Sequence, residues 1–227
     1  MKSSAQNKQH TAGRTRISEN AKRTFKRCGQ YIVFIFFVSI FVNVCIRLDV
    51  IVLGSSLSET SVTEIAQIAL LVITSACFYR LSQREVKLRH AAILMAGFFA
   101  VLTIREMDHW FDIVSHGFWF YPALAVTVAV LCYAYRGGVH TVNELATVLR
   151  LSHTKQLITW VILLLVFSRV YGMGGLWQQV MGEHYIREVK NISEEGIELL
   201  CYSFIAMSAV QIYSKFTMAN REMAGDR

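Results

Sequence analysis

Long apolar runs alternate along the chain with shorter charged segments. Six runs approach the roughly 20 residues that an α-helix needs to cross the hydrocarbon core of a bilayer. They occupy residues 30–46, 62–79, 91–104, 119–135, 157–171 and 197–214. Several are slightly short, and we expect polar residues at the membrane interface or facing other helices to complete each span. The pattern predicts an all-α polytopic membrane protein, built as a bundle of six transmembrane helices.

Polar segments flank this bundle and connect its helices. Residues 1–29 carry eight Lys and Arg and few large apolar side chains, which predicts a disordered basic tail. Residues 30–214 form the transmembrane domain, and residues 215–227 form a second tail. Inside the domain, residues 135–156 predict an amphipathic helix on the membrane surface, and residues 177–189 predict a short interfacial helix.

Composition and motifs exclude several classes of protein. The chain is 54% hydrophobic and contains one proline, which is unusual for a soluble domain. Its five cysteines form no CxxC pair, which argues against a zinc ribbon or a disulfide framework. The sequence also contains no HExxH, GxSxG or Walker motif. Any chemistry must therefore come from residues without a standard signature.

The distribution of charge gives the bundle an orientation. A net charge of +7 would suit a nucleic-acid-binding protein, but the charges are unevenly placed. With the N-terminus inside and the loops assigned alternately, the inner segments hold 18 of the 23 Lys and Arg but 5 of the 16 Asp and Glu. Lys and Arg near the membrane favour the cytoplasmic side. We therefore expect cytoplasmic termini, a bacterial inner membrane, and membrane lipids rather than nucleic acid as partners.

The segment REMDHWFDIVSHGFW follows the third apolar run and contains six ionisable side chains. If the helix continues to Gly117, then Arg105, His109, Asp112 and His116 share one face, because residues three or four apart are neighbours on a helix. Two imidazoles and a carboxylate suit a divalent metal such as zinc, iron or manganese. The alternative is a hydrogen-bond network of histidine, aspartate and arginine at the end of a helix.

A second polar stripe begins the last span. Glu195, Glu198 and Tyr202 follow helical spacing, and Glu194 lies one turn before Glu198. Asn191 resembles a helix cap, and carboxylates at a helix N-terminus complement the helix dipole, which explains Glu194 and Glu195 without a function. Glu198 lies deeper, so we expect it to be a metal ligand, a proton carrier or the partner of an arginine.

Each outward-running helix ends near an arginine on the same predicted side. These residues are Arg47, Arg105 and Arg169. A guanidinium can hold a phosphate through two hydrogen bonds, so Arg105 and Arg169 are candidates for binding a lipid headgroup. Salt bridges to the nearby carboxylates are the plainer interpretation.

The outer polar residues fit three functions. The first is a metal-dependent enzyme acting on a lipid or lipid-linked substrate, in which His109, Asp112 and His116 hold the metal. Glu195 or Glu198 would then serve as the catalytic base for a metal-bound water. The second is a small transporter or channel for protons or metal cations, for which six helices form a thin pathway and a homodimer is expected. The third is a non-catalytic membrane assembly protein.

Overall fold

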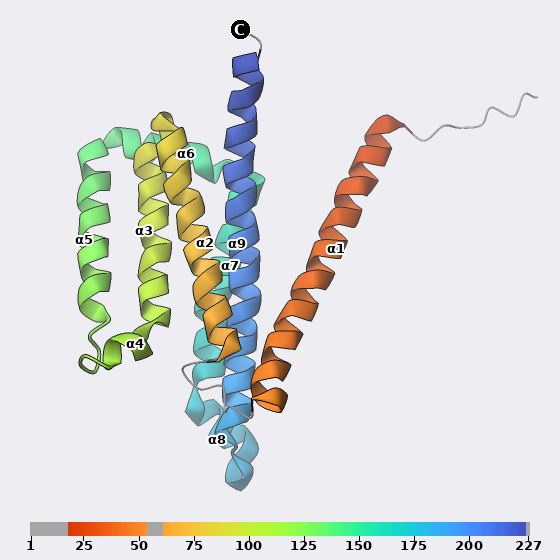
Figure 1. Ribbon diagram of the computed structural model, residues 1–227, viewed down its shortest axis with the longest axis vertical. Helices are drawn as coiled ribbons and strands as arrows, with labels where there is room; N and C mark the ends of the chain where they lie inside the picture. Colours follow the sequence, from red (N-terminus) through yellow and green to blue (C-terminus); the bar gives the residue numbers. More distant parts are fainter. Residues whose placement is uncertain (1–17, 54–60, 226–227) are drawn as a thin grey trace, which may run out of the picture. The chain divides into compact units, whose positions relative to one another are not determined.

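The computed structural model describes residues 18–53 and 61–225 of the 227-residue chain. Contacts within the chain divide it into two units, Met1–Phe37 and Val38–Arg227. Within the described ranges every regular element is a helix (Figure 1). The predicted all-α class is therefore confirmed.

Twelve helical elements follow one another in the described ranges. In chain order they are α1 (Glu19–Arg47), the π-helix η1 (Leu48–Val52), α2 (Val62–Arg84), the 3₁₀ turn η2 (Val86–Leu88), α3 (Arg89–Glu106), α4 (Asp108–Asp112), α5 (Phe120–Gly137), α6 (Val139–Leu149), α7 (Ser152–Gly172), α8 (Gly174–Met181), the 3₁₀ turn η3 (Gly182–His184) and α9 (Arg187–Gly225).

Six helical segments are long and apolar enough to cross a membrane. They are Glu19–Val52, Val62–Arg84, Val86–Glu106, Phe120–Gly137, Ser152–Gly172 and Arg187–Met218. Each contains, or overlaps closely with, one of the six apolar runs in the sequence. The chain is therefore a multi-pass membrane protein with a six-helix transmembrane region, as the sequence predicts.

The first unit contains the beginning of α1. The hydroxyl of Ser18 accepts a hydrogen bond from the backbone N–H of Ala21 at 3.3 Å, and Glu19 pairs with Lys22 at 2.7 Å. A side-chain cap of this kind satisfies a free N–H at the start of a helix. Residues 19–29 are thus helical rather than part of the predicted tail, while residues 1–17 lie outside the described ranges.

In the second unit, Asp49 joins the end of the first span to the start of α2. Its buried carboxylate accepts hydrogen bonds from the N–H groups of Val62 at 2.7 Å and Thr63 at 2.9 Å, and from the Thr63 hydroxyl at 2.5 Å. Ser61 caps the same helix by accepting from the N–H of Glu64 at 3.1 Å. The negative carboxylate also complements the positive N-terminal end of the α2 dipole.

Helix α9 is longer than its apolar run. It begins at Arg187 and passes through Asn191 without a break, so the predicted cap at Asn191 is wrong. Lys190 and Glu194 pair at 2.7 Å one turn apart, and the Ser193 hydroxyl bonds to the carbonyl of Val189 at 2.8 Å. Such pairs support a helix across a polar stretch. The predicted interfacial helix at 177–189 is instead divided between α8, η3 and the start of α9.

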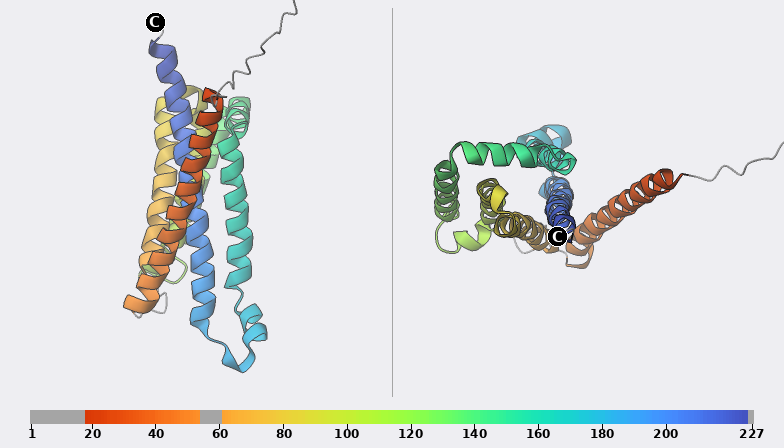
Figure 2. Two further views of the ribbon diagram at one scale, coloured as in Figure 1. Left: turned by 90° about the vertical axis from the view of Figure 1, so that its right-hand side faces the viewer. Right: turned by 90° about the horizontal axis from the view of Figure 1, so that it is seen from above.

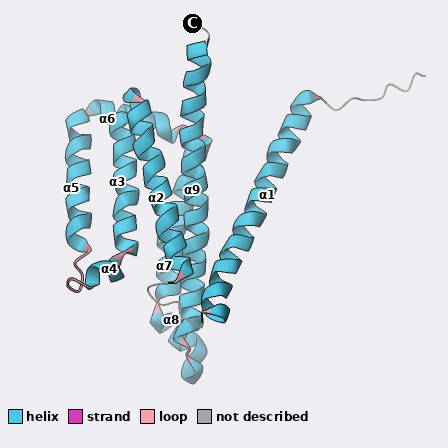
Figure 3. Cartoon of the chain, viewed as in Figure 1, coloured by secondary structure: helices cyan, strands magenta, loops and turns pink. Residues whose placement is uncertain are grey.

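The core of the second unit forms where α2, α3, α7 and α9 pack. Helix α9 contacts both α2 and α7, and α3 lies between α2 and α5 (Figure 2). Stacked aromatic pairs bridge neighbouring helices, with ring centres 5.8 Å apart for Phe78 and Phe99 and 4.2 Å apart for Trp160 and Phe204. Helix α6 contacts α3, α5 and α7 at one end of the bundle (Figure 3). Among the described residues, α3 and α7 do not pack directly against each other.

Candidate functional site

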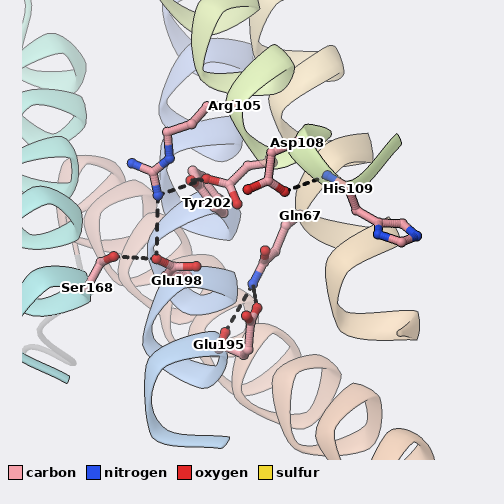
Figure 4. A network of polar contacts seen from close by, with 9 residues as sticks. Gln67, Arg105, Asp108, His109, Ser168, Glu195, Glu198 and Tyr202 are labelled. Carbon is pink, nitrogen blue, oxygen red and sulfur yellow. Dashed lines mark hydrogen bonds and ion pairs between the residues drawn. The ribbon is translucent and has the colours of Figure 1, made fainter. Parts of the chain in front are cut away.

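Polar side chains from four helices meet near the end of α3. The hydroxyl of Tyr202 donates a hydrogen bond to Glu106 Oε1 at 2.7 Å (Figure 4). The guanidinium of Arg105 lies 3.3 Å from Glu106 Oε1 and 4.0 Å from Glu198 Oε1. The Ser168 hydroxyl on α7 donates to Glu198 Oε1. These contacts tie α3, α7 and α9 together through one carboxylate, that of Glu198.

Helix α2 joins the same network through Gln67. Its side-chain amide donates to Glu195 Oε2 at 2.8 Å and to the Glu195 carbonyl at 3.2 Å. Gln67 is 1% exposed and Glu198 is 4% exposed, so both side chains are buried, whereas the side chain of Arg105 is 45% exposed. We call Glu106, Glu195 and Glu198, with Arg105, the glutamate cluster.

The spacing on α9 explains how the cluster assembles. Glu195, Glu198 and Tyr202 share one face, and that face contacts both α2 and the polar end of α3. The predicted stripe on the last span therefore meets Arg105, as its position on the same predicted side required. Glu194 lies beside the stripe and pairs with Lys190 instead.

The cluster contains more carboxylates than cations. It has three glutamates and one arginine, and Arg105 pairs with Glu106 and Glu198, while Glu195 accepts a hydrogen bond from Gln67. Buried charges inside a membrane bundle normally find partners, because an isolated charge is costly there. The excess of negative groups can be balanced by protons or by a positive group on a ligand.

A polar pocket of about 840 Å³ opens beside the cluster. Its wall includes Arg105, Asp108, Ser168, Arg169 and Glu194. The apolar part of the wall includes Trp119, Leu164, Leu165 and Met173. Ser168 thus lines the pocket and also contacts Glu198, which connects the open space directly to the buried carboxylate.

A second, apolar pocket of about 320 Å³ lies between α3 and α7, two helices that also contribute to the wall of the polar pocket. Met95 and Phe98 of α3 face Ile158 and Ile162 of α7 across it, and no polar atom is exposed in it. On α7 the polar pocket begins at Leu164, two residues after Ile162. The space between α3 and α7 therefore changes from apolar to polar toward the glutamate cluster.

The predicted stripe of Arg105, His109, Asp112 and His116 does not form on one continuous helix. Helix α3 ends at Glu106, α4 covers Asp108–Asp112, and turns follow to Trp119. Asp112 Oδ1 accepts a hydrogen bond from the Gly117 N–H at 2.8 Å, and Oδ2 lies 2.9 Å from His116 Nδ1. Gly117 has a φ of 76°, which favours glycine. This closed turn ends the helix before His116.

The same turn favours the charged form of the Asp112 carboxyl. The backbone N–H of Gly117 lowers the pKa of the Asp112 carboxyl below its ordinary value, and the imidazole of His116 lowers it further. Of the alternative to a metal site, the structure shows the contact between aspartate and histidine. The arginine of that alternative, Arg105, instead belongs to the glutamate cluster.

The predicted divalent-metal site gains no support from this geometry. Across residues 18–53 and 61–225, no three His, Cys, Asp or Glu side chains are grouped so that they could hold a metal ion. The side chain of His116 is 99% exposed. The imidazole of His109 points away from Arg105 and Glu198 (Figure 4). Within those ranges, no such group joins His109, Asp112 or His116 to the two predicted catalytic residues, Glu195 and Glu198.

Three members of the network were not predicted to take part in the site. They are Glu106, Gln67 and Ser168. Glu106 and Ser168 each adjoin a predicted arginine in sequence, and this adjacency at a helix end is the one signal that could have identified them.

No protein family, curated protein or solved structure significantly matches this chain. Its class therefore rests on the fold and the site alone. They define a multi-pass α-helical membrane protein with a buried glutamate cluster beside a polar pocket at one end of its bundle.

Proposed function

We propose that this protein is a membrane enzyme that acts on a lipid or lipid-linked substrate held between α3 and α7. The observation that carries the proposal is the pair of pockets on these two helices, one polar and one apolar. An amphiphile fits such a pair with its headgroup in the polar pocket and a hydrocarbon chain in the apolar one. Phe98 and Ile162 are 44% and 54% exposed, which leaves the apolar part accessible to bilayer lipids.

Distances along α7 agree with a single molecule occupying both pockets. Ile162 and Arg169 are separated by seven residues, which is about 10 Å along a helix. A headgroup beside Arg169 therefore leaves the first part of its chain level with Ile162. Arginines at this depth favour a phosphate, because a guanidinium donates two parallel hydrogen bonds to phosphate oxygens.

The two arginines of the polar pocket differ in their ion pairs. Arg105 is already paired with Glu106 and Glu198. Arg169 is exposed and forms no ion pair with any residue in the described ranges, so its charge is available to a substrate. We assign headgroup binding chiefly to Arg169, and to Arg105 the coupling of that headgroup to the glutamate cluster.

Glu198 is the best placed acid–base group. It reaches the polar pocket through Ser168, because it accepts a hydrogen bond from the Ser168 hydroxyl, which lines that pocket. Glu195 is instead held by a hydrogen bond from Gln67 on α2. A carboxylate next to a hydroxyl can take its proton or that of a water in the same place. In this proposal Glu198 is the general base and Glu195 holds the cluster in position.

A turnover assay tests the enzyme proposal. Purified protein is incubated with the total lipid extract of its own membrane, and the lipids are compared by mass spectrometry before and after. We expect the amount of one lipid species to decrease with the wild type and to remain constant with Glu198→Gln. Loss of an acid–base group typically lowers the reaction rate by about 100-fold or more. Glu188→Gln, an exposed site on α9, is the matched control. Equal lipid profiles for all three proteins would contradict the proposal.

A proton carrier is the second candidate, and the excess of carboxylates in the glutamate cluster favours it. A transport path also needs polar groups toward the other end of the bundle. There, the hydroxyls of Thr74, Ser203 and Ser208 each bond to a backbone carbonyl one turn earlier, at 2.8 Å, which supports helix packing rather than a path. Proton flux into liposomes that is lost in Glu198→Gln would favour transport over the enzyme.

The orientation is part of the proposal. The polar pocket would face the extracytoplasmic side of a bacterial inner membrane, because the basic segments gather at the opposite end of the spans. Fusion of a topology reporter after residue 227 tests this assignment. Activity of a reporter that works only in the cytoplasm is expected, and activity of a periplasmic reporter would reverse it.

A further inference from the structure

A third pocket, separate from the glutamate cluster, lies at the opposite end of α3. It has a volume of about 500 Å³ and is lined by Lys87, His90, Arg136, His140 and Glu144, among others. We call it the basic pocket. The start of α3, the end of α5 and helix α6 all contribute to its wall.

Glu144 fixes the wall of the basic pocket. Its Oε2 accepts a hydrogen bond from the N–H of Ala91 at 3.0 Å, and its Oε1 lies 3.0 Å from His90 Nδ1. The His90 ring in turn stacks on Tyr133 with ring centres 5.0 Å apart. Contacts from α6 to α3 and from α3 to α5 thus hold the pocket in one arrangement before any ligand binds.

The charge of the basic pocket is unbalanced. The one carboxylate in its wall, that of Glu144, is engaged by His90 and by the N-terminus of α3. Lys87 and Arg136 are exposed, and neither forms an ion pair with a residue in the described part of the chain. His140 is also exposed. Two unpaired cations in a preformed hollow favour an anion.

The position of the pocket indicates where this anion comes from. His90 and Arg105 are 15 residues apart on α3, or about 22 Å, so the two ends of the helix lie near opposite surfaces of a ~30 Å hydrocarbon core. Phospholipid phosphates lie at that level. Tyr135 and Val139, which flank the pocket in sequence, are 88% and 75% exposed. They present an apolar surface to the hydrocarbon chains of neighbouring lipids.

We propose that the basic pocket is a binding site for a phosphate group, carried by an anionic phospholipid, with Lys87 and Arg136 as the principal ligands. Basic pockets between membrane helices hold such headgroups by charge and hydrogen bonding. Arg136 donates to two phosphate oxygens, and Lys87 adds a point charge. The site lies apart from the substrate pocket proposed above and does not depend on it.

Thermal unfolding of the purified full-length chain tests the site, because a ligand that binds the folded state raises the unfolding temperature. The additions are bicelles containing anionic phospholipid, bicelles of zwitterionic phospholipid alone, and inorganic phosphate. We expect a rise with the anionic bicelles that is lost in the Lys87→Gln, Arg136→Gln double variant. Arg150→Gln, an exposed basic residue at the end of α6 outside the pocket, is expected to keep it.

The other outcomes are decisive in different ways. Equal rises with anionic and zwitterionic bicelles, or a rise that survives in the double variant, would overturn the site. A rise with inorganic phosphate that requires Lys87 and Arg136 would support the phosphate site and replace the lipid by a soluble phosphate as its source. Because both substituted side chains are exposed, the double variant is expected to unfold near the wild-type temperature without additions.

Discussion

At the scale of single residues, hydrogen bonds to carboxylates hold the glutamate cluster together. Tyr202 is 1% exposed and its hydroxyl reaches Glu106, so the ring fills the core while its polar end satisfies a carboxylate. Hydrogen bonds to charged groups contribute about 1.5–3 kcal/mol each, more than bonds between neutral groups. The network is therefore a contributor to stability as well as a candidate site.

Removing the Tyr202 hydroxyl should measure this contribution. We expect Tyr202→Phe to lower the free energy of unfolding by about 1.5–3 kcal/mol, because Glu106 loses a donor in a place that water does not reach. Tyr213→Phe is the matched control, since the Tyr213 ring lies 5.6 Å from the Arg84 guanidinium and its hydroxyl has no partner among the described residues. Denaturation in detergent compares the two, and equal losses would contradict the assignment.

The stability of the turn at Asp112 is expected to depend on pH. Its carboxyl has a lowered pKa because the Gly117 N–H and then His116 stabilise the charged form. The stabilisation is thus present above the ordinary pKa of aspartate and is lost as the pH falls through the lower, folded value. NMR titration of a ¹³C-labelled Asp112 carboxyl should show a midpoint below that of a free aspartate. A midpoint at or above it would show that the turn does not form.

At the scale of helices, the close approach of α3 and α5 depends on Gly97. A Cβ atom at this position would lie 2.9 Å from Val130 Cγ1 and 3.0 Å from Val130 Cβ, closer than carbon atoms pack. Small residues allow membrane helices to approach in this way. Helix α3 also contributes to the walls of both candidate substrate pockets.

Gly97→Ala is therefore expected to destabilise the protein by about 1–3 kcal/mol, the usual range for an overpacked contact. Gly175→Ala on α8 is the control, because a Cβ there meets nothing within 4 Å. The control should be neutral or stabilise by up to about 1 kcal/mol through helix propensity. Thermal unfolding distinguishes the two variants, and a neutral Gly97→Ala would mean that α3 and α5 are further apart.

The sequence predicted the helices better than their ends. Apolar length alone identified six spans, because no other arrangement buries such runs. The start of α1 and the continuity of α9 through Asn191 depend on local pairs, Ser18 with Ala21 and Lys190 with Glu194, which compete against polar composition. The chain leaves the helix after Glu106 and forms a turn closed by Asp112 and Gly117. The spacing of polar residues in the sequence predicts a helix that continues to Gly117, because spacing alone does not reveal this turn.

The candidate site could be predicted from the sequence only in part. Spacing along α9 was enough to place Glu195, Glu198 and Tyr202 on one face. Which residues on other helices they meet depends on packing between distant segments. Gln67 carries no local signal of it, and Ser168 carries only its place next to Arg169. The histidine prediction followed a helix that ends too early, so His109, Asp112 and His116 never formed the continuous stripe.

At the scale of the whole chain, the two ends of α3 differ in chemistry. One end carries carboxylates with arginines beside a polar pocket, and the other carries a basic pocket whose cations are unpaired within the described ranges. The spans between them provide an apolar pocket at intermediate depth. The two ends are the places to which we assign the two proposed lipid headgroups.

The central claim is that one lipid occupies the polar and apolar pockets together. A phospholipid with a photoreactive group in its chain tests it most directly, with crosslinked peptides of the membrane-reconstituted protein mapped by mass spectrometry. We predict labelling near Phe98 and Ile162 that falls several-fold in Arg169→Gln and is unchanged in Arg136→Gln, which alters only the basic pocket. Labelling at Phe98 and Ile162 that is the same in Arg169→Gln as in the wild type would contradict the account.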